Sequence, residues 1–175
     1  MSDFLLRAEE LVEAGRYLYA RGMVPATSGN LSARLADGSI AITVSGRHKG
    51  RLRTDDIMRV DTAGQSLDGR RPSAETLLHT QLYARFADAA VVLHPHSVNA
   101  TVLSLLCADP LVLQDYELLK AFPDVASHDC NVAVPVFDND QHIARLAAVV
   151  DARLAIGCDA PGYLIRGHGF YTWGA

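Results

Sequence analysis

The stretch VVLHPHSVNA, residues 91–100, constrains the fold of this chain more than any other segment. Its apolar run predicts a buried strand, and because side chains alternate across a strand, His94 and His96 project from the same face. Two neighbouring imidazoles where a sheet gives way to a loop are well placed to hold a transition metal through neutral ring nitrogens. The alternative is a hydrogen-bonded pair of histidines at a strand end, and the tripeptide alone does not decide between the two.

Composition indicates one globular unit spanning residues 1–175. Hydrophobic residues make up 49% of the 175 and charged residues 21%, and no stretch is long and apolar enough to cross a membrane. The first fifteen residues carry acids within an apolar pattern and have no basic flank, which argues against a secretory signal and predicts a cytoplasmic protein. A net charge of −4 without a long basic run argues against a nucleic-acid surface. Cys107, Cys130 and Cys158 are widely spaced, which predicts reduced thiols.

The clearest predicted helix covers residues 71–86, with apolar residues at helical spacing. Ser73 is expected to cap it and Glu75 to lie in its first turn, where the helix dipole stabilises a carboxylate. His79, one turn further on, is expected to be an i, i+4 neighbour of Glu75 and not a metal ligand.

Other helices are expected after polar caps. These caps are Asp3, Ser97 and the DND sequence of residues 138–140. The inner face of the helix after Ser97 is expected to consist of Val98, Val102 and Leu105. A further short helix, residues 115–122, carries Glu117, which in most proteins would be a solvated helix acid.

Alternation of apolar and polar residues predicts the strands. Residues 31–35 and 40–44 form a predicted β-hairpin around an Asp-Gly turn, and residues 132–136 form a further strand. The last predicted strand, residues 163–165, leads into RGHGF, residues 166–170. There His168 is flanked by two glycines that allow close backbone approach, so it is a candidate third metal ligand.

Three small polar segments are candidate anion sites. They are TSGNLS at residues 27–32, Ser45 with Gly46, and the expected helix start at Ser73. Backbone N–H groups and hydroxyls in such segments can hold a phosphate, although ordinary turns explain the same residues. The basic run at residues 47–49 could also bind phosphate, or it could be a solvated turn.

A metal held by three neutral histidines keeps an open position and its full charge, which suits polarisation of a carbonyl. With a phosphate cradle nearby, the pattern predicts a sugar-phosphate enzyme. The pieces TSGNLS, TVSGRHKG, PSAETLLH, LHPHS, YELLKAF and RGHGFYTWG, in this order and spacing, resemble the class II aldolase superfamily across residues 22–174. TVSGRHKG, YELLKAF and RGHGFYTWG are most similar to its dehydratase branch.

The resemblance implies an α/β fold, with an α/β/α layered domain around a mainly antiparallel sheet, and a homotetramer with active sites near subunit interfaces. It implies metal-ligand roles for His94, His96 and His168, usually with Zn²⁺. Phosphate contacts are implied for Asn30, Ser45, Gly46 and Ser73. Glu117 and Glu75 both match positions of acid/base carboxylates, so two residues compete for that role.

The activity implied by the resemblance is metal-dependent dehydration of 5-methylthioribulose 1-phosphate to 5-methylthio-2,3-dioxopentyl phosphate in methionine salvage. Alternatives are an aldolase or epimerase acting on another sugar phosphate, and a catalytically idle metal-binding scaffold subunit. The sequence departs from the family pattern at Pro95, where Thr is common between the two histidines. It also lacks a C-terminal helix that the family leads us to expect after Ala175.

Overall fold

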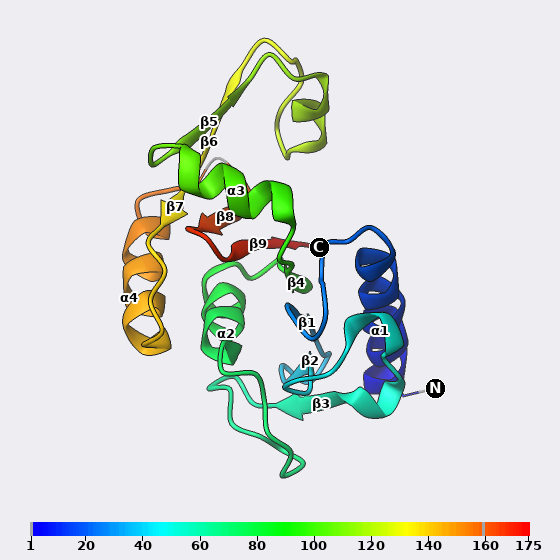
Figure 1. Cartoon of the computed structure of the whole chain (residues 1–175). Coiled ribbons are helices and arrows are strands. Elements are labelled where there is room, and N and C mark those ends of the chain that lie inside the picture. Colours follow the sequence, from blue (N-terminus) through cyan, green and yellow to red (C-terminus); the bar gives the residue numbers. More distant parts are fainter. Residues whose placement is uncertain (1, 159) are drawn as a thin grey trace.

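A mixed β-sheet forms the centre of the molecule (Figure 1). The computed structural model describes residues 2–158 and 160–175, and within them seven strands make this sheet in the order β3-β2-β1-β4-β9-β8-β7. Neighbouring strands are antiparallel except for β7 and β8, which are parallel. The α/β fold with a mainly antiparallel sheet is therefore confirmed.

The strands of this sheet are β1 (Asn30–Arg34), β2 (Ile40–Thr43), β3 (Ile57–Val60), β4 (Val91–His94), β7 (Val136–Phe137), β8 (Gly162–Ile165) and β9 (Gly169–Gly174). The predicted hairpin is confirmed, since β1 and β2 pair with Ser32 opposite Ile42. A separate two-stranded sheet joins β5 (Leu111–Gln114) to β6 (Asn131–Val134). With the 3₁₀ helix η3 (Glu117–Ala121), these strands form a projection, residues 111–134, that we call the arm.

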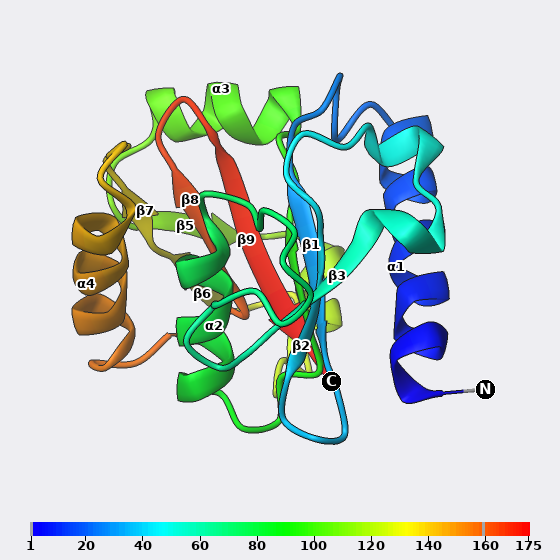
Figure 2. The same cartoon turned by 90° about the horizontal axis from the view of Figure 1, so that it is seen from below.

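Helices cover both faces of the sheet, as the two views show (Figures 1 and 2). The α-helices are α1 (Asp3–Ala20), α2 (Thr76–Arg85), α3 (Val98–Leu106) and α4 (Ile143–Leu154), and the short 3₁₀ helices η1 (Lys49–Arg51) and η2 (Thr54–Asp56) precede β3. One core lies between α1 and the β1–β2 side of the sheet. The larger core joins α2 and α4 to the opposite face. No helix in the described part of the chain is long and apolar enough to span a membrane.

Three helices begin at other residues than the sequence predicts. Ser2, not Asp3, caps α1 by accepting a hydrogen bond from the Leu5 N–H. Helix α2 begins at Thr76, so Ser73 lies before the helix and Glu75 occupies the cap position without a capping bond. Helix α4 begins after His142, whose ring accepts from the Arg145 N–H, instead of after residues 138–140. In α1 and α4 a nearby polar side chain provides a cap that the pattern alone does not distinguish.

The expected inner face of α3 was wrong. Val98, Val102 and Leu105 are 63%, 48% and 62% exposed, and Ser104 is the buried residue of this helix. Ser104 accepts a hydrogen bond from the Gly167 N–H and so ties α3 to the turn after β8. Helical spacing correctly predicted an apolar face but could not tell whether this chain itself covers it.

One predicted strand was wrong, and one strand of the sheet was missed. The expected strand at residues 132–136 is divided at Pro135, because β6 belongs to the arm while β7 belongs to the main sheet. Proline has no N–H to give to a ladder, so a change of sheet at this point is physically reasonable. Strand β9 was not predicted, although it lies between β4 and β8 in the sheet.

Candidate active site

Glu75, His94, His96 and His168 meet at one point, with ligand atoms that all lie within 4.8 Å of one another. The His94 Nε2 atom lies 2.9 Å from the His96 Nε2 and 3.3 Å from a Glu75 carboxylate oxygen. The second carboxylate oxygen lies 3.4 Å from the His168 Nε2. Strand β4 supplies His94, the residues just after it supply His96, the turn between β8 and β9 supplies His168, and the start of α2 supplies Glu75.

The ring of His94 is held in a defined orientation. Its Nδ1 donates to the Phe170 carbonyl oxygen at 2.9 Å, and the ring stacks on Tyr171 with centroids 4.1 Å apart. Because Nδ1 carries the proton in this bond, the Nε2 lone pair points into the cluster. A histidine whose second nitrogen donates to a backbone carbonyl is a common arrangement for metal ligands.

Close packing of the two histidine segments requires a glycine at position 169. A Cβ built on Gly169 would lie 2.4 Å from the Pro95 carbonyl oxygen and 3.2–3.3 Å from ring carbons of His96 and His94. Any side chain would therefore push β9 away from the HPH segment. The glycine after His168 brings the distant turn close enough to join the cluster.

Burial favours the neutral forms of His96 and His168 beside an ionised Glu75 carboxylate. Burial lowers the pKa of His96 to about 4, with a further contribution from His94, and burial also lowers the pKa of His168. Burial raises the pKa of the Glu75 carboxyl, but the neighbouring His94, His168 and Asn30 outweigh it and hold the pKa at about 2. Ring nitrogens from three histidines and one anionic oxygen are a donor set that suits a divalent transition metal such as zinc.

The four candidate phosphate contacts line one cavity of about 340 Å³, whose wall also includes Glu75 and His96. The four are Asn30, Ser45, Gly46 and Ser73. Asn30 lies directly opposite His94 in the β1–β4 pairing. The Ser45 N–H donates to the Arg71 carbonyl oxygen at 3.3 Å, and Val44 forms a bridge with Pro72. The turn after β2 and the approach to α2 are thus joined at the cavity, where Gly46 has a φ of 75° that favours glycine.

Lys49 also lines this cavity, although the sequence presented it only as part of a basic run. Its side chain is buried, and its ammonium group donates to the Thr27 and Arg47 carbonyl oxygens at 2.9 and 2.7 Å. Burial lowers its pKa to about 8. Lys49 therefore links the two loops that border the cavity and places a cation beneath them.

Glu117 lies elsewhere in the chain. It belongs to the arm, its side chain is 71% exposed, and its ion-pair partners in the described residues, Lys120 and His128, are also on the arm. It is not among the residues that this chain brings together around His94. The structure thus joins Glu75 to the histidines and leaves Glu117 on a projecting surface.

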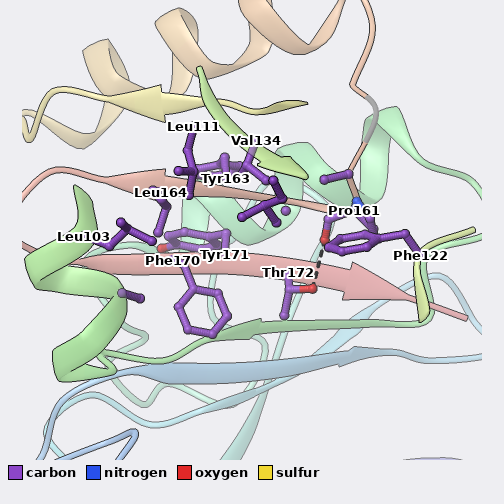
Figure 3. Close-up of a pocket in the computed structure, with 14 residues that line it drawn as sticks. Leu103, Leu111, Phe122, Val134, Pro161, Tyr163, Leu164, Phe170, Tyr171 and Thr172 are labelled. Atoms are coloured by element: carbon purple, nitrogen blue, oxygen red, sulfur yellow. Dashed lines mark hydrogen bonds between the residues drawn. The ribbon is translucent and has the colours of Figure 1, made fainter. Parts of the chain in front are cut away.

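A second cavity, of about 300 Å³, lies among α3, the arm and strands β8 and β9 (Figure 3). Its wall is apolar and includes Leu103, Val134 and Phe170, and no His, Cys, Asp or Glu of the described residues lines it. Phe170 and Tyr171 both border this second cavity, and the Tyr171 ring also stacks on His94. No histidine or carboxylate in the described part of the chain borders the apolar cavity, whereas Glu75 and His96 border the polar one, so the polar cavity is the better candidate for chemistry.

Comparison with known sequences gives a consistent result. Residues 9–175 match the family model described as the class II aldolase and adducin N-terminal domain. A methylthioribulose-1-phosphate dehydratase of Methylococcus capsulatus is 60% identical over 173 residues, which cover 99% of this chain and 85% of that protein. A protein of the same name from Pseudomonas paraeruginosa is 62% identical over 169 residues, covering 95% and 82% of the two chains.

Solved structures resemble the whole chain as well. YgbL of Escherichia coli superposes with a TM-score of 0.82 at 26% identity, covering 98% of this chain and 79% of that one. The L-fuculose-1-phosphate aldolase of Thermus thermophilus superposes with a TM-score of 0.74 at 28% identity, covering 99% and 80%.

Proposed function

This chain belongs to the class II aldolase and adducin family, and from that premise we propose that it is a methylthioribulose-1-phosphate dehydratase. The observation that carries the proposal is the identity of about 60% with dehydratases of that name over nearly the whole chain. The enzyme is a hydro-lyase of methionine salvage. It converts 5-methylthioribulose 1-phosphate into 5-methylthio-2,3-dioxopentyl phosphate, and residues 1–175 act as one catalytic unit.

The polar cavity supports the binding of the substrate phosphate. Hydroxyl groups of Ser45 and Ser73, the amide of Asn30 and the backbone at Gly46 border it, so neutral donors surround the anion. The cation of Lys49 lies beneath the same loops. Because His96 and Glu75 share this wall, a sugar phosphate held there would reach the histidine cluster with its carbonyl end.

His94, His96 and His168 would hold the metal, for which we propose Zn²⁺, and Glu75 lies close enough to contact it before substrate arrives. A divalent metal at this position would polarise the C2 carbonyl and stabilise negative charge on its oxygen. The chain's own contribution is to fix the three imidazoles, through the bond from His94 Nδ1 to Phe170 and the close approach at Gly169.

Proton transfer requires a base for the C3 proton and an acid for the C4 hydroxyl. Loss of both groups as water leaves a C3–C4 enol that tautomerises to the 2,3-diketone, so the atoms balance without an oxidant or reductant. We assign this proton transfer to Glu117. Because Glu117 is exposed on the arm and apart from its own chain's histidines, we place it in the active site of a neighbouring copy.

Assembly into a homotetramer is part of this proposal. Apolar residues remain exposed on the arm and on α3, including Leu118, Leu105 and Leu106, and such surfaces are typical of subunit contacts. We place the reaction in the cytoplasm, a compartment in which free thiols such as those of Cys107 and Cys130 persist.

An assay of the purified, metal-loaded protein with 5-methylthioribulose 1-phosphate tests the function. We expect formation of the diketone phosphate, followed by its absorbance and by mass spectrometry as a loss of one water. A sugar-phosphate aldolase would instead release two carbonyl fragments by cleaving a carbon–carbon bond. A protein that binds metal but gives neither product would be the idle scaffold.

A further inference from the structure

A buried line of hydrogen bonds leads to the active-site carboxylate. The Tyr83 hydroxyl lies 2.8 Å from the Ser32 hydroxyl, which lies 2.7 Å from the His79 Nδ1. The His79 Nε2 bonds to the Asn30 side-chain oxygen, and the Asn30 Nδ2 donates to Glu75 at 2.8 Å. These side chains are at most 5% exposed, apart from Glu75. Solvent is therefore not available as a substitute partner within the line.

The carboxylate determines the direction of every bond. Ionised Glu75 can only accept, so the Asn30 amide must present its NH₂ group to Glu75 and its oxygen to His79. The Asn30 oxygen also only accepts, so the His79 Nε2 must carry a proton. Since burial lowers the pKa of His79 to about 3, the ring is neutral and its Nδ1 accepts from Ser32.

The same amide group serves the phosphate cavity. The Asn30 Nδ2 also donates to the Ser73 hydroxyl at 3.2 Å, and both residues border the cavity. If the His79 Nε2 lost its proton, the Asn30 oxygen would face a lone pair. The amide could relieve this repulsion only by turning its oxygen towards the Glu75 carboxylate, which is equally unfavourable.

We propose that His79 is a positioning residue that fixes the Asn30 amide, so that one face of the amide serves Glu75 and the phosphate cavity at the same time. Its ring is itself held edge-on to Tyr171, with centroids 5.4 Å apart, and Tyr171 stacks on His94. The role of His79 in holding Asn30 is independent of the reaction. Its effect on substrate binding rests on the proposed function.

Two variants separate positioning from simple core packing. His79→Leu fills a similar volume but removes the Nε2–H donor, whereas His79→Gln keeps an amide N–H that can reach Asn30. Thr80→Val is the matched control, because Thr80 is a buried polar residue of the same helix whose hydroxyl bonds only to the Leu77 carbonyl among the described residues.

Nitrogen-15 spectra of the zinc-loaded protein test the position of the amide directly. We expect the wild-type His79 to show a proton on Nε2 and none on Nδ1, without change between pH 5 and 9. The Asn30 side-chain NH₂ signals should shift and broaden in His79→Leu and return towards their wild-type values in His79→Gln. A wild-type proton on the His79 Nδ1 would overturn the proposal, and so would Asn30 NH₂ signals that do not change in His79→Leu. The wild-type measurement decides even if the variant does not fold.

Binding measurements then connect the amide to function. By calorimetry we expect His79→Leu to weaken inorganic phosphate binding about 10-fold and to raise KM for the sugar phosphate similarly, with zinc content unchanged. His79→Gln should recover most of this loss, and Thr80→Val should show none. If the Asn30 signals respond as expected while phosphate affinity does not change, positioning by His79 stands and the phosphate role of Asn30 is wrong.

Discussion

Glu75 and Glu117 are the two carboxylates that the sequence offers for proton transfer, and the molecule treats them in opposite ways. The side chain of Glu75 is 14% exposed and lies between two histidines and the Asn30 amide. The side chain of Glu117 is 71% exposed on the arm and pairs with Lys120 and His128. Burial within the chain fixes the Glu75 carboxylate, whereas the arm carries the Glu117 carboxylate at the surface.

This contrast indicates that the buried cluster around Glu75 and the arm that carries Glu117 have different roles. A carboxylate fixed by buried neutral groups is ionised and immobile before substrate arrives, which suits a site that holds a metal. An exposed carboxylate on a projecting arm can approach a substrate that another surface has bound. Surface ion pairs such as Glu117 with Lys120 contribute little to stability, so breaking that pair on assembly costs little.

The largest expected effect comes from removing a ligand of the buried region. In His94→Ala the metal content should fall close to zero and activity should fall to background, because His94 is the most buried of the three proposed ligands. Elemental analysis after dialysis gives the metal content. His128→Ala, which alters the arm, should keep its metal, and full metal content in His94→Ala would remove that residue from the site.

The next effect concerns the arm. Glu117→Gln should lower kcat by about 10²- to 10⁴-fold, the usual cost of losing an acid/base group, while metal content and subunit assembly stay unchanged. Glu75→Gln should reduce kcat less, since the role we propose for Glu75 is to position groups near the metal. Steady-state kinetics and size-exclusion chromatography measure these quantities.

Mixed oligomers show whether the arm serves a neighbouring copy. Coexpressed His94→Ala and Glu117→Gln subunits should regain activity, because some interfaces then pair an intact histidine cluster with an intact Glu117. Mixtures that stay inactive would mean that Glu117 acts only within its own chain. A dead Glu75→Gln with an active Glu117→Gln would reverse the assignment of the two acids.

A smaller effect is expected for the phosphate cavity. Ser45→Ala and Ser73→Ala should each raise KM by about 10- to 100-fold, the range for a hydrogen bond to a charged group, with little change in kcat. Ser127→Ala, an exposed serine of the arm, is the matched control. If Lys49→Ala abolishes binding while both cavity variants behave like wild type, a buried cation and not the serine hydroxyls holds the anion.

The smallest effect tests how tightly the buried region is packed. Gly169→Ala should lower the free energy of unfolding by about 1–3 kcal/mol, because its Cβ would meet the Pro95 carbonyl oxygen at 2.4 Å. Gly174→Ala in the same strand has no neighbouring atom within 4 Å and should change stability little. Denaturant titrations of both variants without metal give the difference in their free energies of unfolding. Equal stabilities would show that β9 can shift to accommodate the added Cβ at little cost.

Much of the buried region could be predicted from sequence because its signals are local. The spacing of His94 and His96 on one strand end follows from the period of two, and the β1–β2 hairpin follows from alternation around Asp37 and Gly38. The glycines around His168 indicated close approach. What no local pattern contained was the meeting of His168 with His94, which depends on how β9 pairs.

The regions that were predicted wrongly depend on longer-range relations. The apolar face of α3 was expected to pack inside its own chain, because periodicity identifies a face but not what covers it. His79 lies outside the cluster of Glu75 and the three histidines, as predicted, but its contacts with Ser32 and Asn30 on β1 were missed. Those contacts join residues 47 and 49 positions apart, which sequence spacing cannot reveal.

Strand β9 lies between β4 and β8 in the sheet, yet it comes after all the other described strands in chain order. During synthesis on the ribosome, the edge of β4 that pairs with β9 therefore stays unpaired while the arm, α4 and β8 emerge. An open strand edge is a site of wrong pairing, and contacts between distant residues slow folding. The proposed metal ligands His94 and His168 flank this delayed pairing, so metal captured from the cell would favour the correctly closed sheet over its misfolded competitors.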